Sequence, residues 1–93
     1  MRSMKLLETE ILNFDNWLLP WTFHDSIIYS LSITYEDKEL FKTIWATAID
    51  SSNWKNSDLV TGRKVAEARL SELYRLSDNA IASIVRAASY EWR

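Results

Sequence analysis

The chain has 93 residues, a formal net charge of −2 and no cysteine. A chain of this length closes around one core, so we expect a single helical domain spanning residues 1–93. The absence of cysteine excludes disulfides, thiol nucleophiles and thiolate metal sites. A typical nucleic-acid binder carries a basic face, and the distribution of charge along this sequence shows none.

The first predicted helix covers residues 4–13, in which apolar side chains share one side. The chain then breaks at Pro20, because proline lacks an amide hydrogen and biases Leu19 away from helical angles. A second helix is expected to start at Thr22, since Asp25 three residues later resembles a capping pattern.

Residues 26–35 are the ambiguous segment of the sequence. Ile27, Tyr29, Leu31, Ile33 and Tyr35 alternate there with small polar residues, a pattern typical of a strand. A strand needs a partner, and residues 40–49 fit a helix better, so we predict a helix over 26–35. The alternative is an α+β fold with a two-stranded hairpin within 26–49.

The clearest helix spans residues 37–50 and is expected to begin at Thr34, where Asp37 matches the capping pattern and acidic groups complement the helix dipole. Its apolar side chains all lie on one half of the helical wheel. They are Leu40, Phe41, Ile44, Trp45, Ala48 and Ile49. Such a stripe must be covered by other helices.

A polar loop is predicted over residues 51–58, with Trp54 alone in its middle. A long helical segment follows from Leu59, and Gly62 suggests that the regular helix begins near residue 61 or 63. Ser77 is expected to cap the last helix, which runs from Asp78 to about residue 92. Together these elements predict an all-α fold, a compact bundle of about five short helices.

Protein binding is the function that the aromatic residues favour. Trp54 and its neighbour Lys55 lie in a polar loop, and Trp17 and Trp21 lie in a connection more apolar than a linker needs. Exposed tryptophan is enriched among the residues that anchor interfaces. We therefore predict these four side chains as contact residues.

The alternative function is DNA binding, because residues 69–86 resemble the helix-turn-helix of bacterial repressors. The resemblance implies a transcriptional regulator in which Asn79 and Ser83 face base edges while Arg75 and Arg86 meet phosphates. The segment departs from that pattern at the turn, where Arg75 replaces the usual glycine. Residues 57–93 carry six basic and five acidic side chains, a net charge of only +1.

Catalysis and metal binding have little support in the sequence. His24 is the only histidine, and its neighbour Asp25 is the only obvious partner for it. No nucleophile motif or phosphate loop is present, and the chain has one glycine. We therefore expect no enzymatic activity, no cofactor and no metal site.

The sequence thus predicts a non-catalytic module that binds a protein of unidentified kind, as a small inhibitor, adaptor or accessory factor of bacterial or phage type. Self-association into a homo-oligomer is a further expectation, because small helical proteins often cover apolar surface in a symmetric dimer. Nucleic acid is a partner only under the alternative. With no signal-peptide core and no apolar run of about 20 residues, the chain is expected to be cytoplasmic and not to enter a membrane.

Overall fold

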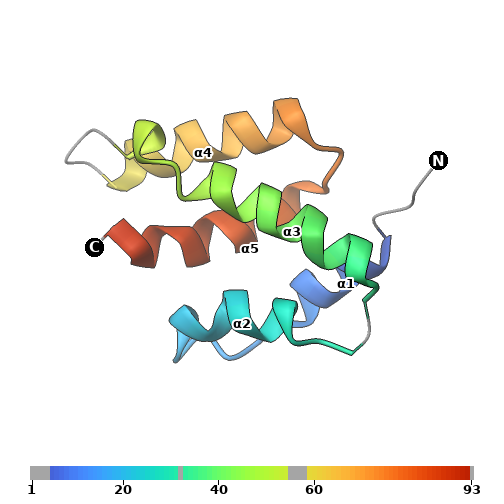
Figure 1. Cartoon of the computed structure of the whole chain (residues 1–93). Helices are drawn as coiled ribbons and strands as arrows, with labels where there is room; N and C mark the ends of the chain where they lie inside the picture. Colours follow the sequence, from blue (N-terminus) through green and yellow to red (C-terminus); the bar gives the residue numbers. More distant parts are fainter. Residues whose placement is uncertain (1–4, 32, 55–58, 93) are drawn as a thin grey trace.

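The computed structural model describes residues 5–31, 33–54 and 59–92, and all of the regular structure in this part of the chain is helical. This confirms the predicted all-α fold (Figure 1). The α-helices are α1 (Lys5–Asn13), α2 (Phe23–Ile28), α3 (Tyr35–Ala48), α4 (Leu59–Leu73) and α5 (Asp78–Ser89). Three single-turn 3₁₀ helices accompany them, η1 (Pro20–Thr22), η2 (Ser51–Asn53) and η3 (Tyr90–Trp92). No helix among the described residues is long and apolar enough to cross a membrane.

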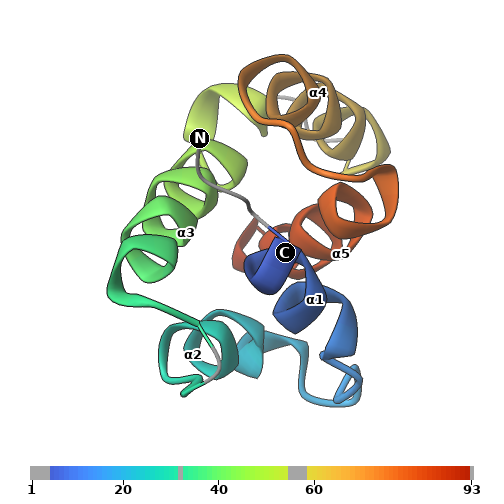
Figure 2. The same ribbon diagram turned by 90° about the vertical axis from the view of Figure 1, so that its right-hand side faces the viewer.

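Helix α5 is the central element of the bundle, since it contacts α1, α3 and α4. Helices α4 and α5 lie side by side and run in opposite directions, and α3 crosses in front of them (Figures 1 and 2). Helix α2 lies at the edge of the molecule, where it packs on α3 and η1. One face of α2 therefore has no helix over it.

The core is built around the inner faces of these helices. Seven of the twelve residues of α5 are buried, and the small side chains Ala80, Ala87 and Ala88 let the neighbouring helices approach closely. The largest fully buried side chains come from every α-helix of the bundle. They are Leu7, Ile11, Phe23, Ile27, Phe41, Ile44, Leu70, Ile84 and Val85.

Helix starts were predicted better than helix lengths. Thr34 accepts a hydrogen bond from the backbone N–H of Asp37 at 3.1 Å, and Ser77 accepts one from Ala80 at 3.2 Å, so both predicted caps are confirmed. Helix α2 does follow Thr22, but this side chain is no cap. Its hydroxyl donates instead to the carbonyl of residue 19 at 2.7 Å.

The prediction of a continuous helix over 26–35 is wrong for residues 29–31, 33 and 34, and residue 32 lies outside the described residues. Helix α2 ends at Ile28 and α3 begins at Tyr35, and no strand occurs in residues 5–31, 33–54 or 59–92. The alternating apolar residues are divided between two environments, since Ile27 and Ile33 are buried while Tyr29 and Leu31 are exposed. This connection lets Thr34 cap a new helix that starts in a different direction.

Candidate protein-binding surface

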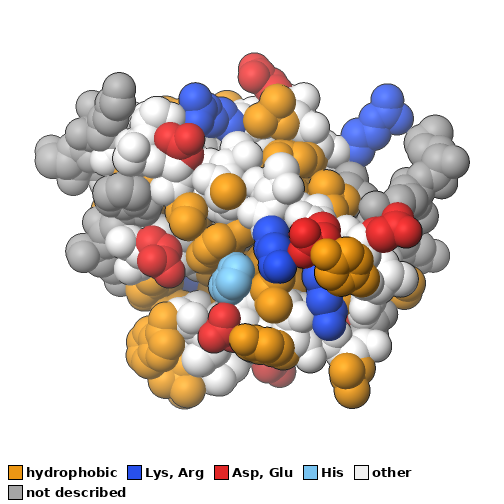
Figure 3. All heavy atoms as spheres, in the orientation of Figure 1, with side chains coloured by type: hydrophobic (Ala, Val, Ile, Leu, Met, Phe, Trp, Pro, Cys, Tyr) orange, Lys and Arg blue, Asp and Glu red, His pale blue; other side chains and the backbone are white. Residues whose placement is uncertain are grey.

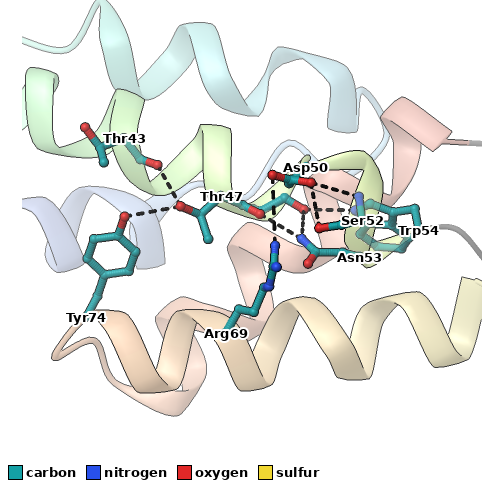
Figure 4. Close-up of polar contacts among 9 residues, drawn as sticks. Thr43, Thr47, Asp50, Ser52, Asn53, Trp54, Arg69 and Tyr74 are labelled. Atoms are coloured by element: carbon teal, nitrogen blue, oxygen red, sulfur yellow. Dashed lines mark hydrogen bonds and ion pairs between the residues drawn. The ribbon is translucent and has the colours of Figure 1, made fainter.

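The structure places Trp54 in the interior, so the prediction that it is an exposed contact residue is wrong. Its side chain is 7% exposed, and its indole Nε1 donates to the carbonyl oxygen of Ala48 at 2.9 Å. Asn53 donates to the same oxygen at 3.2 Å, and Figure 4 shows the two side chains together at the end of α3. The last carbonyls of a helix lack an intrahelical donor, and these two side chains donate to one of them. Lys55 lies outside the described residues.

Gly62 is the fourth residue of α4, near its beginning as predicted, but the helix already starts at Leu59 rather than at residue 61 or 63. A Cβ atom at this position would lie 2.4 Å from Cε3 of Trp54, closer than real Cβ contacts. Glycine is therefore required here by the indole that rests on the helix. Trp54 joins α3 to α4, which makes it a structural residue.

A second contact between these helices involves Arg69. Its guanidinium Nη1 lies 4.0 Å from Oδ2 of Asp50, just beyond the end of α3 (Figure 4). The other carboxylate oxygen of Asp50 accepts hydrogen bonds from the backbone N–H and the hydroxyl of Ser52 at 2.8 and 2.7 Å.

Trp17 is half-buried in an aromatic cluster and is only in part available for contact. Its ring meets Phe14 edge-on at a centroid distance of 4.9 Å and stacks on Phe23 at 5.9 Å. The guanidinium carbon of Arg86 lies over the same ring at 4.2 Å from its centroid. Phe14, Phe23 and Arg86 therefore already contact the Trp17 ring.

Trp21 is the predicted contact residue that the structure leaves open, with 64% of its side chain exposed. Along the helical run formed by η1 and α2, Phe23 and Ile27 point into the core. Trp21, Asp25 and Tyr29, each four residues apart, lie on the opposite side. Trp21 thus belongs to the outer face of α2.

This outer face continues into the segments on either side of α2. We define the α2 surface as six exposed apolar side chains from η1, α2 and the adjoining connections, up to the first residue of α3. They are Leu18, Leu19, Trp21, Tyr29, Leu31 and Tyr35. Figure 3 shows hydrophobic side chains at several places along the lower rim of the molecule, over α2 and its flanks, with polar atoms between them.

Trp21 is the only member of the α2 surface that was predicted from the sequence as a contact residue. Leu31 is 99% exposed, and Leu18, Tyr29 and Tyr35 are at least as open as Trp21. The alternation of residues 26–35 was the available signal, but we interpreted this segment as one helix. Apolar side chains at every second position of an extended chain all point to one side, and here they are divided between the core and solvent.

Acidic groups lie beside the α2 surface. Asp25 projects from α2 itself, with 72% of its side chain exposed, and its Oδ1 lies 3.1 Å from Nδ1 of His24. An open groove of about 240 Å³ runs between the end of α1 and α2, and its lining includes Glu10, Asp15 and Ser26 but no lysine or arginine. The apolar surface therefore has a negatively charged border on this side.

His24 packs against two aromatic residues of α3. Its ring centroid lies 5.8 Å from that of Phe41 and 5.4 Å from that of Trp45. On the solvent side, its Nδ1 lies 3.1 Å from Oδ1 of Asp25. These contacts give His24 a packing role at the junction of α2 and α3.

Of the four residues predicted to touch DNA, Asn79, Ser83 and Arg86 recur at helical spacing on one face of α5, and Arg75 lies in the connection between α4 and α5. The antiparallel packing of α4 and α5 differs from a helix-turn-helix, in which the second helix crosses the first steeply. Arg86 is engaged with Trp17. Asn79 borders an open groove of about 600 Å³ whose lining includes Lys64 as well as Glu67 and Asp78, so it offers phosphate one cation and two groups that repel it.

No group of three or more histidine or acidic side chains that could hold a metal ion occurs in the part of the chain that the structure describes. Comparisons of the chain with protein-family models, with curated proteins and with solved structures find no match.

Proposed function

We propose that this chain is a non-catalytic protein-binding module, an inhibitor, adaptor or accessory factor of bacterial or phage type, and that it binds its partner through the α2 surface. Trp21 is the proposed anchor. Tryptophan and tyrosine combine a large apolar area with a polar atom, and they are the residues on which interfaces most often depend.

The observation that carries the proposal is the clustering of exposed apolar groups. Among the described residues, eleven large hydrophobic side chains are exposed, and six of them fall between Leu18 and Tyr35. Single exposed hydrophobic residues are normal on any protein, but a contiguous group of them marks an interaction site. The group contains one tryptophan and two tyrosines.

Photo-crosslinking tests this function directly. A photoreactive amino acid at Leu31 should give a discrete adduct with one other protein in cells that express the chain naturally, and the additional change Trp21→Ser should abolish it. The matched control position is Leu73, the last residue of α4, which is 63% exposed. Helix α4 lies on the opposite side of the bundle from α2 (Figure 2). Adducts of equal yield from both positions, or none from Leu31, would contradict the proposal.

The competing DNA-binding function is tested by retention on heparin at low salt, where even non-specific DNA binders are held. We expect the chain to elute without retention. Retention that disappears in an Arg75→Ala variant would favour the alternative instead.

A further inference from the structure

The α2 surface lies in the most acidic part of the chain. Residues 15–39 carry five acidic side chains and one lysine, a formal charge of −4, although the whole chain has only −2. The residues outside 15–39 therefore carry a formal charge of +2. The charge of this protein is concentrated around the same segment that exposes the apolar side chains.

The structure shows two positions at which acid and apolar groups meet. Asp25 shares the outer face of α2 with Trp21 and Tyr29, because the three recur at helical spacing. The groove beside α2 adds Glu10 and Asp15, with no cation in its lining. A partner that covers the tryptophan must therefore also face carboxylates.

We infer that the occupant of the α2 surface is a cationic amphipathic segment of another protein, with an apolar stripe flanked by lysine or arginine. This inference rests on the function proposed above. Apolar side chains of the partner would cover Trp21 and Tyr29, and its cations would lie over Asp25 and the acidic groove. Opposite charges across an interface select the partner and accelerate its approach.

A second copy of this chain is the less favourable occupant. A symmetric dimer through α2 would place the same patch of both subunits together, so Asp25 and the groove carboxylates of one copy would face those of the other. Like charges that face each other across an interface disfavour it. We therefore expect sedimentation velocity to show a monomer at tens of micromolar.

The binding experiment uses two synthetic helical peptides of one design. The first contains only leucine and lysine, with leucine on one face, and in the second glutamate replaces every lysine. Fluorescence anisotropy of the labelled peptides should show binding of the lysine peptide and none of the glutamate peptide. Trp21→Ser should weaken binding of the lysine peptide by more than about tenfold, as for a central anchor.

Two carboxylate variants distinguish attraction of the lysine peptide to Asp25 at the α2 surface from its general attraction to an acidic protein. Asp25→Asn should weaken binding of the lysine peptide by about two- to fivefold, the range of an exposed ion pair. Glu72→Gln removes the same charge from the exposed end of α4 and should change the affinity little. The effect of Asp25→Asn should disappear near 1 M salt, where the screening length falls to about 3 Å.

Each failure has a distinct meaning. Equal binding of both peptides, each lost with Trp21→Ser, would overturn the charge inference and leave the binding surface intact. Binding that Trp21→Ser does not change would overturn the assignment to this surface. A dimer that Trp21→Ser dissociates would make a second copy the occupant. Failure of the proposed function itself is read separately, from the absence of a crosslink at Leu31.

Discussion

The contact between Trp54 and Gly62 predicts a substitution whose effect changes sign with its background. Alanine at position 62 would place Cβ 2.4 Å from the indole Cε3, about 1 Å short of an ordinary contact, which begins at 3.4 Å. The indole cannot easily retreat, because its Nε1 is hydrogen-bonded to Ala48 at 2.9 Å. Overpacking of this kind costs about 1–3 kcal/mol.

Helix propensity acts in the opposite direction. Alanine inside a helix is favoured over glycine by about 1 kcal/mol. In the native chain the clash outweighs this gain, and we expect Gly62→Ala to lower the free energy of unfolding by about 1 kcal/mol. In a Trp54→Leu background, which lacks the six-membered ring, Gly62→Ala should raise the free energy of unfolding by about 1 kcal/mol. The coupling between the two sites is then about 2 kcal/mol.

Urea denaturation followed by far-ultraviolet circular dichroism measures all four members of this cycle. Ser71→Ala, at an exposed position of the same helix, is the control and should give the same small gain in both backgrounds. If Gly62→Ala stabilised the native chain as much as the Trp54→Leu variant, the indole would not rest on α4, and the structural role of Trp54 would be refuted.

Two further predictions concern helix ends and pH. Thr34→Ala and Ser77→Ala should each lower the free energy of unfolding by about 1 kcal/mol through loss of a cap, whereas Thr43→Ala, in the exposed middle of α3, should not; equal losses at all three would contradict the capping assignment. A hydrogen bond from Lys42 to Glu39 at 2.9 Å, together with the charge of Glu39, raises the pKa of Lys42 above 10.5. This contribution to stability is present below pH 10.5 and is lost as the pH rises through the higher pKa of the folded state. Glu39→Gln should return the pKa toward 10.5 in an NMR titration, and an unchanged value would contradict the pairing.

The fold class could be predicted because its signals are local. The stripe that includes Phe41 and Ile44 requires a helix covered by other helices, and both residues are fully buried in α3. Thr34 and Ser77 cap helices through contacts that span three residues, which the sequence displays directly. Such features depend little on the rest of the chain.

The position of Trp54 could not be predicted in this way, because it depends on a contact between two helices. Its polar neighbours are typical of an exposed loop, but Asn53 turns inward and donates to carbonyls at the end of α3. The sequence signal for this contact was the lone glycine of the following helix. A glycine inside a helix costs about 1 kcal/mol and usually has a packing reason. Gly62 is the site where the indole rests.

The candidate surface was predicted in part. Trp21 was identified because the segment around Pro20 is more apolar than a connection needs. Tyr29 and Leu31 were missed because residues 26–35 were predicted to form one helix, whereas α2 ends at Ile28. Their exposure depends on where α2 ends, which is decided by the tertiary packing of α2 on α3 and not by local pattern.

The contact between the first and last α-helices has a consequence for biosynthesis. Helix α1 packs on α5, and the side chain of Glu8 accepts a hydrogen bond from the backbone N–H of Ser77 just before that helix. During translation, Leu7 and Ile11 of α1 therefore lack the cover of α5 until the ribosome has translated the residues between the two helices and α5 has emerged. A nascent chain stalled before residue 78 would present these side chains to chaperones and proteases, so quality control should recognise incomplete copies readily.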